Sequence, residues 1–169
     1  MAADVVDALD GFRSYTEARD GLGDSPFKLA CSLDAPASDA EIASAWPARE
    51  LPSDVLEAWS ISRESRLFED VDYGQWGLVL LSPAAAARRT ADERFQRADA
   101  YRADDVVIGE FLGDQEFLVL APSETDRGYV LVALPLDDRR VWHAVGSDLA
   151  DFLGRYLRAM GDKFWESDR

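Results

Sequence analysis

The 169-residue chain has one cysteine, Cys31, and one histidine, His143. A single cysteine excludes a disulfide within the chain, and these two side chains supply too few soft ligands for a zinc site. Neither is accompanied by residues in a pattern typical of a catalytic nucleophile or a general base. We therefore expect no metal, no cofactor and no catalytic residue, and the sequence predicts that the protein is not an enzyme.

The chain also lacks any run of about 18 apolar residues, the length that a membrane-spanning helix needs. Its first ten residues are acidic, whereas a secretory signal peptide begins with basic residues. We therefore expect a soluble protein that stays in the cytoplasm. With 169 residues and 47% hydrophobic content, the chain can bury the core of one domain.

Basic residues are scarce, because 18 lysines and arginines accompany 33 aspartates and glutamates and give a formal net charge of −15. A field of this sign repels nucleic acid and anionic membranes, so we expect neither as a direct partner. Arginines gather between residues 88 and 97, but acidic residues interleave with them. The charge has two open interpretations: a solvated surface that keeps the protein in solution, or a surface complementary to a basic partner.

Helical signals dominate the first third of the chain. Apolar residues at near-helical spacing predict a helix over about residues 3–18, followed by an irregular stretch through Pro36. Ser38 and Glu41 form a capping-box pattern, in which each side chain accepts from the other residue's backbone N–H at a helix start. The leucine-proline-serine sequence at 51–53 predicts the start of a further short helix.

The stretch from Leu67 to Pro83 changes character, and its pattern predicts a strand, a turn and a second, buried strand. Gly74 and Gly77 punctuate the turn, because glycine adopts backbone angles that bulkier residues resist. Trp76 lies between these glycines. We expect it to be buried beneath the turn, since tryptophan usually packs in cores.

An alanine-rich segment after Pro83 predicts a helix that ends near Arg102. Thr90 and Glu93 offer a second capping box within it. Phe95 falls on the face that we expect to be packed, so the helix is predicted to be amphipathic rather than low in complexity.

The last third of the chain has β-rich runs separated by short turns, and then one strongly amphipathic helical stripe. Gly109 interrupts a run and predicts a bulge. Gly161 suits the end of the final helix, which Gly146 or Ser147 is expected to begin. The predicted strands are 106–108, 117–120, 129–134 and 141–142. Helices around an antiparallel meander predict a single α+β domain with an antiparallel sheet.

Carboxylates gather in two of the predicted turns. Glu69, Asp70 and Asp72 lie near the first, and Asp114 and Glu116 lie in the second. Such groups could bind calcium or perform acid–base chemistry. Their spacing does not match an EF-hand, and acidic turns are expected in so acidic a chain. We therefore favour a role in binding a partner over metal binding or catalysis.

A series of motifs resembles the SUKH superfamily, which includes fungal cell-wall assembly regulators of the Smi/Knr type and many bacterial immunity proteins. The resemblance divides the chain into an N-terminal helix and irregular lead-in at 1–35 and a SUKH-like domain at 36–169, packed together as one domain. One departure is Ser60-Ile61-Ser62, where many members have an Asn-Gly-like turn. The matching stretches are 37–46 with Leu51-Pro52, 67–83, 104–122, 128–157 and 161–166.

The resemblance implies an α+β immunity-type fold and a protein that binds another protein, in bacteria commonly a toxin and often a nuclease. It carries over no catalytic residue. Our hypothesis is that a basic toxin domain meets exposed carboxylates around Glu69, Asp70, Asp72, Asp114 and Glu116, together with an exposed aromatic anchor. The alternative is a regulatory or scaffold adaptor that binds endogenous proteins. The oligomeric state stays open.

Overall fold

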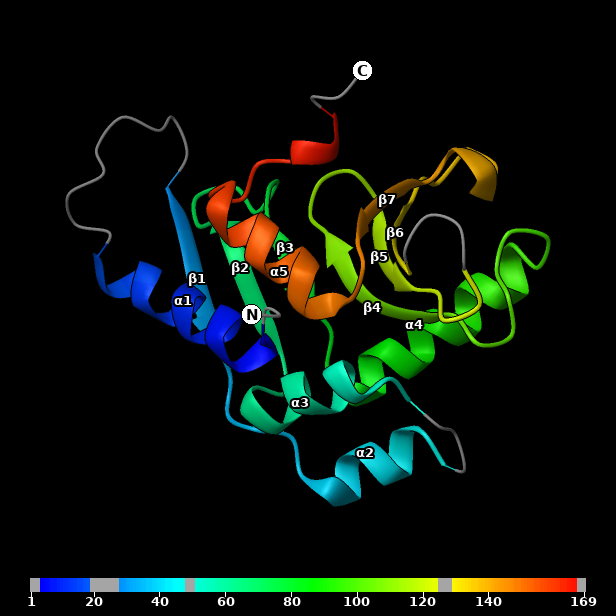
Figure 1. The fold of residues 1–169 in the computed structure, drawn as a ribbon, viewed down its shortest axis with the longest axis horizontal. Coiled ribbons are helices and arrows are strands. Elements are labelled where there is room, and N and C mark those ends of the chain that lie inside the picture. The colour runs from blue at the N-terminus through cyan, green and yellow to red at the C-terminus, as the bar shows by residue number, and fades with distance from the viewer. Residues whose placement is uncertain (1–3, 19–27, 48–50, 125–128, 167–169) are drawn as a thin grey trace.

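A seven-stranded antiparallel sheet forms the centre of the protein, and its strand order follows the chain from β1 to β7. The computed structural model describes residues 4–18, 28–47, 51–124 and 129–166 (Figure 1). The predicted α+β domain with an antiparallel meander is confirmed. The strands are β1 (Leu29–Leu33), β2 (Ser65–Asp70), β3 (Leu78–Leu80), β4 (Val106–Phe111), β5 (Phe117–Leu120), β6 (Val130–Ala133) and β7 (His143–Gly146).

Helices cover both faces of this sheet. Consecutive strand residues point to opposite faces, and every residue of β3 and β6 is buried, so neither face is open at these strands. Two of the helices, α1 and α5, pack against each other and against the strands β1 and β7, while α4 packs on β4. The helices are α1 (Val5–Ala18), α2 (Asp39–Ala45), α3 (Ser53–Ile61), α4 (Pro83–Gln96) and α5 (Leu149–Arg158), with short 3₁₀ turns η2 (Arg139–Val141) and η3 (Phe164–Glu166).

Several local signals give the predicted structure. Ser38 and Glu41 form the complete capping box at the start of α2. The register between β4 and β5 shifts at Gly109, where a bulge was predicted. Gly77 has a φ of 122°, and a Cβ there would lie 2.7 Å from the Cα of Glu69, so only glycine fits. These features depend on a few neighbouring residues, which is why the sequence predicts them.

The prediction of an irregular stretch through Pro36 is wrong for β1. This strand is five residues long, and only Cys31 in it is buried. Its partners lie far along the chain, since Leu29 pairs with Asp70 and Leu33 with Ser65. The strand forms because β2 provides an edge for it, and a local pattern cannot show that edge.

The end predicted for the alanine-rich helix and its capping box at Thr90 are also wrong. Ser82 caps α4, with its side chain accepting from the Ala85 backbone N–H, and the helix ends at Gln96. Thr90 lies inside the helix, where its hydroxyl accepts a hydrogen bond of 2.9 Å from the backbone N–H of Val107 in β4. Phe95, predicted to pack, is 89% exposed. The Thr90 pattern thus reflects packing of α4 on the sheet and not a cap.

The last strand and the last helix each begin later than predicted. Val141 ends the 3₁₀ turn η2, and the strand β7 starts only at His143. The cap of α5 is Asp148, whose side chain accepts from the backbone N–H of Asp151, rather than Gly146 or Ser147. Both elements begin one or two residues later than predicted, and the order of the elements is unchanged.

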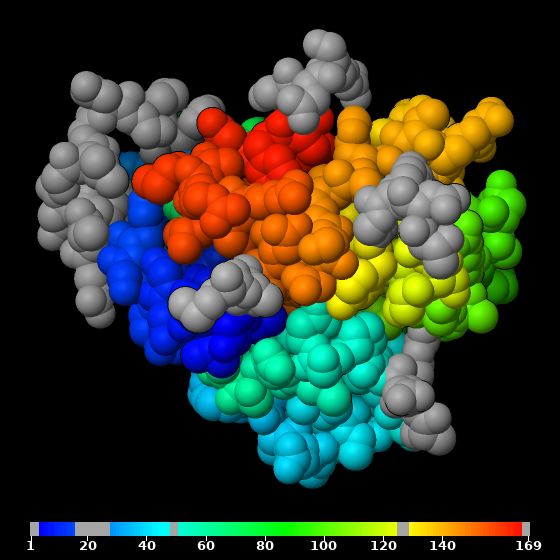
Figure 2. Space-filling view, viewed as in Figure 1, coloured from blue at the N-terminus to red at the C-terminus, as the bar shows by residue number. Residues whose placement is uncertain are grey.

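The end of α5 turns the chain back onto the sheet. Met160 and Gly161 adopt φ values of 55° and 86°, and the Gly161 N–H donates to the Tyr156 carbonyl over 3.2 Å. Gly161 packs so closely on Phe68 that a Cβ would lie 2.6 Å from the Phe68 Cβ. Figure 2 shows the C-terminal segment, in red, on the surface beside α5. Gly161 therefore places the residues that follow it.

We predict opposite effects for two glycine substitutions around α5. Gly161→Ala should lower the free energy of unfolding by about 1–3 kcal/mol, because alanine resists the positive φ and collides with Phe68. Gly154→Ala should raise it by about 0.5–1 kcal/mol, because Gly154 lies inside the helix and its Cβ would meet only the flexible end of Arg158. Urea unfolding of both variants measures the difference, and equal effects would contradict this account of the turn.

Candidate functional site

The five predicted carboxylates lie in or next to two turns that are side by side at one end of the sheet, and Glu69 and Asp70 are the last residues of β2. One turn joins β2 to β3 and the other joins β4 to β5, and β3 pairs with β4. The backbone N–H of Leu112 donates to the Gly77 carbonyl over 2.9 Å. A Cβ on Gly113 would lie 2.3 Å from the Gln75 carbonyl oxygen. The fold thus unites two acidic segments that are separate in the sequence.

The C-terminal segment completes this surface. The indole N–H of Trp76 donates to the Gly161 carbonyl over 3.1 Å, which holds the segment against the first turn. We name residues 69–77, 112–116 and 159–166 the acidic end, because they contain seven acidic residues and one lysine. Sequence reasoning missed Asp162 and Glu166 as members, since only the turn at Gly161 brings them here.

The one lysine of the acidic end points inward. Lys163 is 9% exposed, and its ammonium group donates to Asp114 and, over 2.5 Å, to Oε1 of Glu116. The same nitrogen lies 5.5 Å from the ring centroids of Trp76 and of Phe111. Two carboxylates and two aromatic rings therefore surround the ammonium group, and they come from both turns and from β4.

The charge of Lys163 is stabilised by these neighbours. Burial alone lowers the pKa of the Lys163 ammonium group, but its hydrogen bonds to Asp114 and Glu116 outweigh the burial and raise the pKa above the ordinary lysine value. Lys163 therefore carries a full positive charge at neutral pH. That charge compensates the two carboxylates, which would otherwise repel each other beside the sheet.

Only part of the predicted carboxylate set faces solvent. The expectation that all five are exposed is wrong for Asp70 and Glu116, which are buried. Asp70 accepts from the backbone N–H groups of Asp72 and Tyr73 and so shapes the turn. Glu69 forms an ion pair with Arg66. Asp114 stays half exposed while it binds Lys163. Asp72 is exposed and has no ion pair within the described part of the chain.

Exposed apolar side chains accompany these acids. Tyr73 is 75% exposed at the tip of the first turn, and Met160 is 44% exposed beside Gly161. Trp76 is half-buried, so the expectation of burial holds only in part, and its ring contributes to the surroundings of Lys163. Sequence reasoning favoured no particular exposed aromatic at this turn. The structure gives that position to Tyr73.

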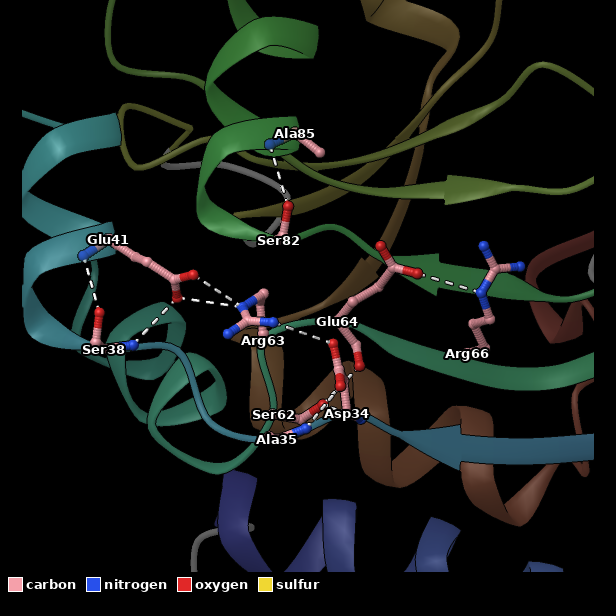
Figure 3. Close-up of polar contacts among 10 residues, drawn as sticks. All are labelled: Asp34, Ala35, Ser38, Glu41, Ser62, Arg63, Glu64, Arg66, Ser82 and Ala85. Carbon is pink, nitrogen blue, oxygen red and sulfur yellow. Dashed lines mark hydrogen bonds and ion pairs between the residues drawn. The ribbon is translucent and has the colours of Figure 1, made fainter.

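Away from the acidic end, a hollow with a volume of about 630 Å³ lies between α2 and α4. Arg63 lines it and forms ion pairs with Glu41 and with Asp34 (Figure 3). The hydroxyls of Ser38 and Ser82 also line it, but each accepts from a backbone N–H at a helix start. The polar groups of this hollow thus connect structural elements, and they do not form a nucleophile and a base.

The described ranges hold no group of three or more histidine, cysteine, aspartate or glutamate side chains arranged to bind a metal ion. Cys31 is buried, and its sulfur accepts from the backbone N–H of Phe68 over 3.3 Å. No helix in the part of the chain that the structure describes has the length and apolarity to cross a membrane. Comparisons with models of known protein families and with curated proteins give no match.

We predict that Lys163→Met lowers the free energy of unfolding at pH 7 by about 3 kcal/mol, because Glu116 would stay buried without its partner. The double variant Lys163→Met/Glu116→Gln should recover much of this loss. Arg13→Met, which removes an exposed ion pair with Asp10, should change stability by less than about 0.5 kcal/mol. Urea unfolding measures all three, and a single variant as stable as the double one would contradict the prediction.

The same variants give a test with pH. A raised folded-state pKa means that the Lys163 contribution is complete below the unfolded value of 10.5 and is lost as the pH rises through the folded value. The stability difference between the wild type and Lys163→Met should therefore stay constant from pH 7 to about 10 and shrink above it. Tyr101 and Tyr156 are buried and have raised pKa values, so they lower the free energy of unfolding of both proteins equally at high pH. The difference in stability between the two proteins therefore reports on Lys163 alone.

Proposed function

We propose that this chain is a protein-binding module without enzymatic activity and that its acidic end binds a basic surface of another protein. The observation that supports this most directly is the gathering of seven acidic residues and one inward-pointing lysine from three segments of the chain. Asp72 and Asp162 present their carboxylates to solvent. A net charge of −15 adds a long-range field that steers a basic partner toward the protein.

Tyr73 is the anchor in this proposal. Tyrosine is enriched among the residues that dominate binding energies, because its ring buries a large area at a small cost in conformational entropy. Its 75% exposed ring next to Asp72 would pack on a partner while the carboxylate meets a lysine or arginine. The partner is then held by a central aromatic contact with charges around it.

The particular role that we propose is that of a bacterial immunity protein, which acts in the cytoplasm and neutralises a nuclease-type toxin. A nuclease needs a basic groove for its substrate, and an acidic protein can occlude that groove by shape and by charge. The resemblance to the SUKH superfamily supports this role, and so does the α+β architecture that the resemblance implies. Membership of the superfamily is part of the proposal.

A pull-down with charge-reversed baits tests the surface. We expect the wild type to capture a basic protein from its host lysate at low salt and less of it at high salt. Asp72→Lys/Asp162→Lys should lose the capture. The matched control is Asp39→Lys/Glu57→Lys, which changes the net charge equally on α2 and α3, at the opposite end of the molecule from the C-terminal segment (Figure 1). It should retain the capture.

The captured protein then decides the role. Nuclease activity that the wild type suppresses and the acidic-end variant does not suppress would support immunity. Capture of housekeeping proteins alone would favour the adaptor. Equal capture by both charge-reversed baits would overturn the assignment of the acidic end as the binding surface.

A second test concerns the anchor. We predict that Tyr73→Ala weakens binding to the captured partner by about 2 kcal/mol, roughly thirtyfold, because a central aromatic contact is lost. Phe95→Ala is the matched control, since Phe95 is an even more exposed aromatic on α4, outside the acidic end. Calorimetric titration of both variants measures the change. A larger effect of Phe95→Ala would place the interface on α4.

A further inference from the structure

The ammonium group of Lys163 is surrounded by side chains of its own chain, whereas that of an ordinary surface lysine is surrounded by water. Its ammonium group contacts the carboxylates of Asp114 and Glu116 and lies 5.5 Å from the ring centroids of Trp76 and Phe111. Carboxylates and aromatic faces are the groups that stabilise an ammonium ion when it leaves water. These two carboxylates and two rings are the kinds of group that bind an alkylammonium ion. In this protein the side chain of Lys163 occupies the space between them.

The walls of this space are fixed by contacts that do not involve the Lys163 side chain. The backbone N–H of Phe111 donates to the Glu116 carbonyl over 2.9 Å and closes the turn between β4 and β5. The hydrogen bond from Leu112 to Gly77 ties this turn to the one that carries Trp76. The four walls should therefore keep their positions when the lysine side chain is removed.

The backbone around Lys163 is also held independently. On one side, the Gly161 carbonyl accepts from the Trp76 indole. On the other side, Trp165 is buried, and its ring centroid lies 5.4 Å from that of Phe111. These two anchors keep the C-terminal segment in place on both sides of the lysine.

We propose that Trp76, Phe111, Asp114 and Glu116 form a lysine-binding cradle, selective for primary alkylammonium groups, in which Lys163 is the resident ligand. A primary ammonium group has three N–H donors, enough for both carboxylates, and its apolar stem matches the aromatic walls. A quaternary ammonium ion lacks the donors, and an alcohol lacks the charge. The cradle is a property of this chain alone and does not rest on the proposed function.

Chemical rescue tests the cradle. Lys163→Ala leaves the walls and removes the resident ammonium, so n-butylammonium should bind the variant, raise its thermal midpoint in a saturable way and shift the indole N–H resonance of Trp76. The wild type, whose cradle is filled, should show neither change. Tetramethylammonium and butan-1-ol at equal concentration are the controls. In Lys163→Ala/Glu116→Gln the apparent affinity for butylammonium should fall by roughly tenfold, since one charged hydrogen bond is lost.

Folded Lys163→Ala that responds to butylammonium no more than to tetramethylammonium would overturn the proposal. Should this variant fail to fold, the wild type supplies a separate measurement. The Cε protons of Lys163 should resonate upfield of those of an exposed lysine, because the adjacent Nζ lies 5.5 Å from the centroids of two aromatic rings. Unshifted Cε protons would also overturn the cradle. Neither experiment needs a partner protein, so failure of the cradle and failure of the proposed function can be told apart.

Discussion

The charge balance of the acidic end depends on the ion pairs of Lys163. In a chain with 33 acidic and 18 basic residues, two carboxylates placed together at the end of the sheet would repel each other. The ammonium group between Asp114 and Glu116 turns that repulsion into attraction, and it ties the C-terminal segment to the turn between β4 and β5. Arg139 has a comparable place elsewhere in the fold, where it pairs with the buried Asp105. The buried carboxylates Glu116 and Asp105 are thus each paired with an inward-pointing basic residue.

This arrangement also determines which charges a partner can meet. The lysine of the acidic end is directed toward the sheet, while Asp72 and Asp162 are directed toward solvent. The positive charge of Lys163 therefore lies beneath the surface of the acidic end. The solvent-exposed side chains of the acidic end are more acidic than the seven acidic residues and one lysine of the whole set indicate. Under the proposed function, this acidic surface attracts a basic partner at long range, and close packing at Tyr73 determines whether that partner stays bound.

The sequence predicts the features that depend on neighbouring residues. The capping box at Ser38 and the glycine turn at Gly77 follow from backbone chemistry within a few positions, and the meander follows from strand-like runs with short connections. The strand β1 depends on a partner that is distant in the chain, so a local pattern does not reveal it. The cap of α4 at Ser82 is local, because its side chain accepts from the backbone N–H of Ala85. The Thr90 pattern misleads because its hydroxyl bonds to β4.

The position of the candidate site could be predicted from the sequence, but the burial of its individual carboxylates could not. Acidic turns on neighbouring hairpins of a meander lie at the same end of the sheet, so the topology itself brings Asp72 and Asp114 together. The neighbouring carboxylates Asp70 and Glu116 are buried and have a structural role. Asp70 holds the backbone of Asp72 and Tyr73, and Glu116 holds Lys163. These two buried carboxylates build the surface, and the exposed ones present charge on it. A count of acidic residues cannot distinguish the two roles, because only tertiary packing determines which carboxylate is surrounded by donors of its own chain.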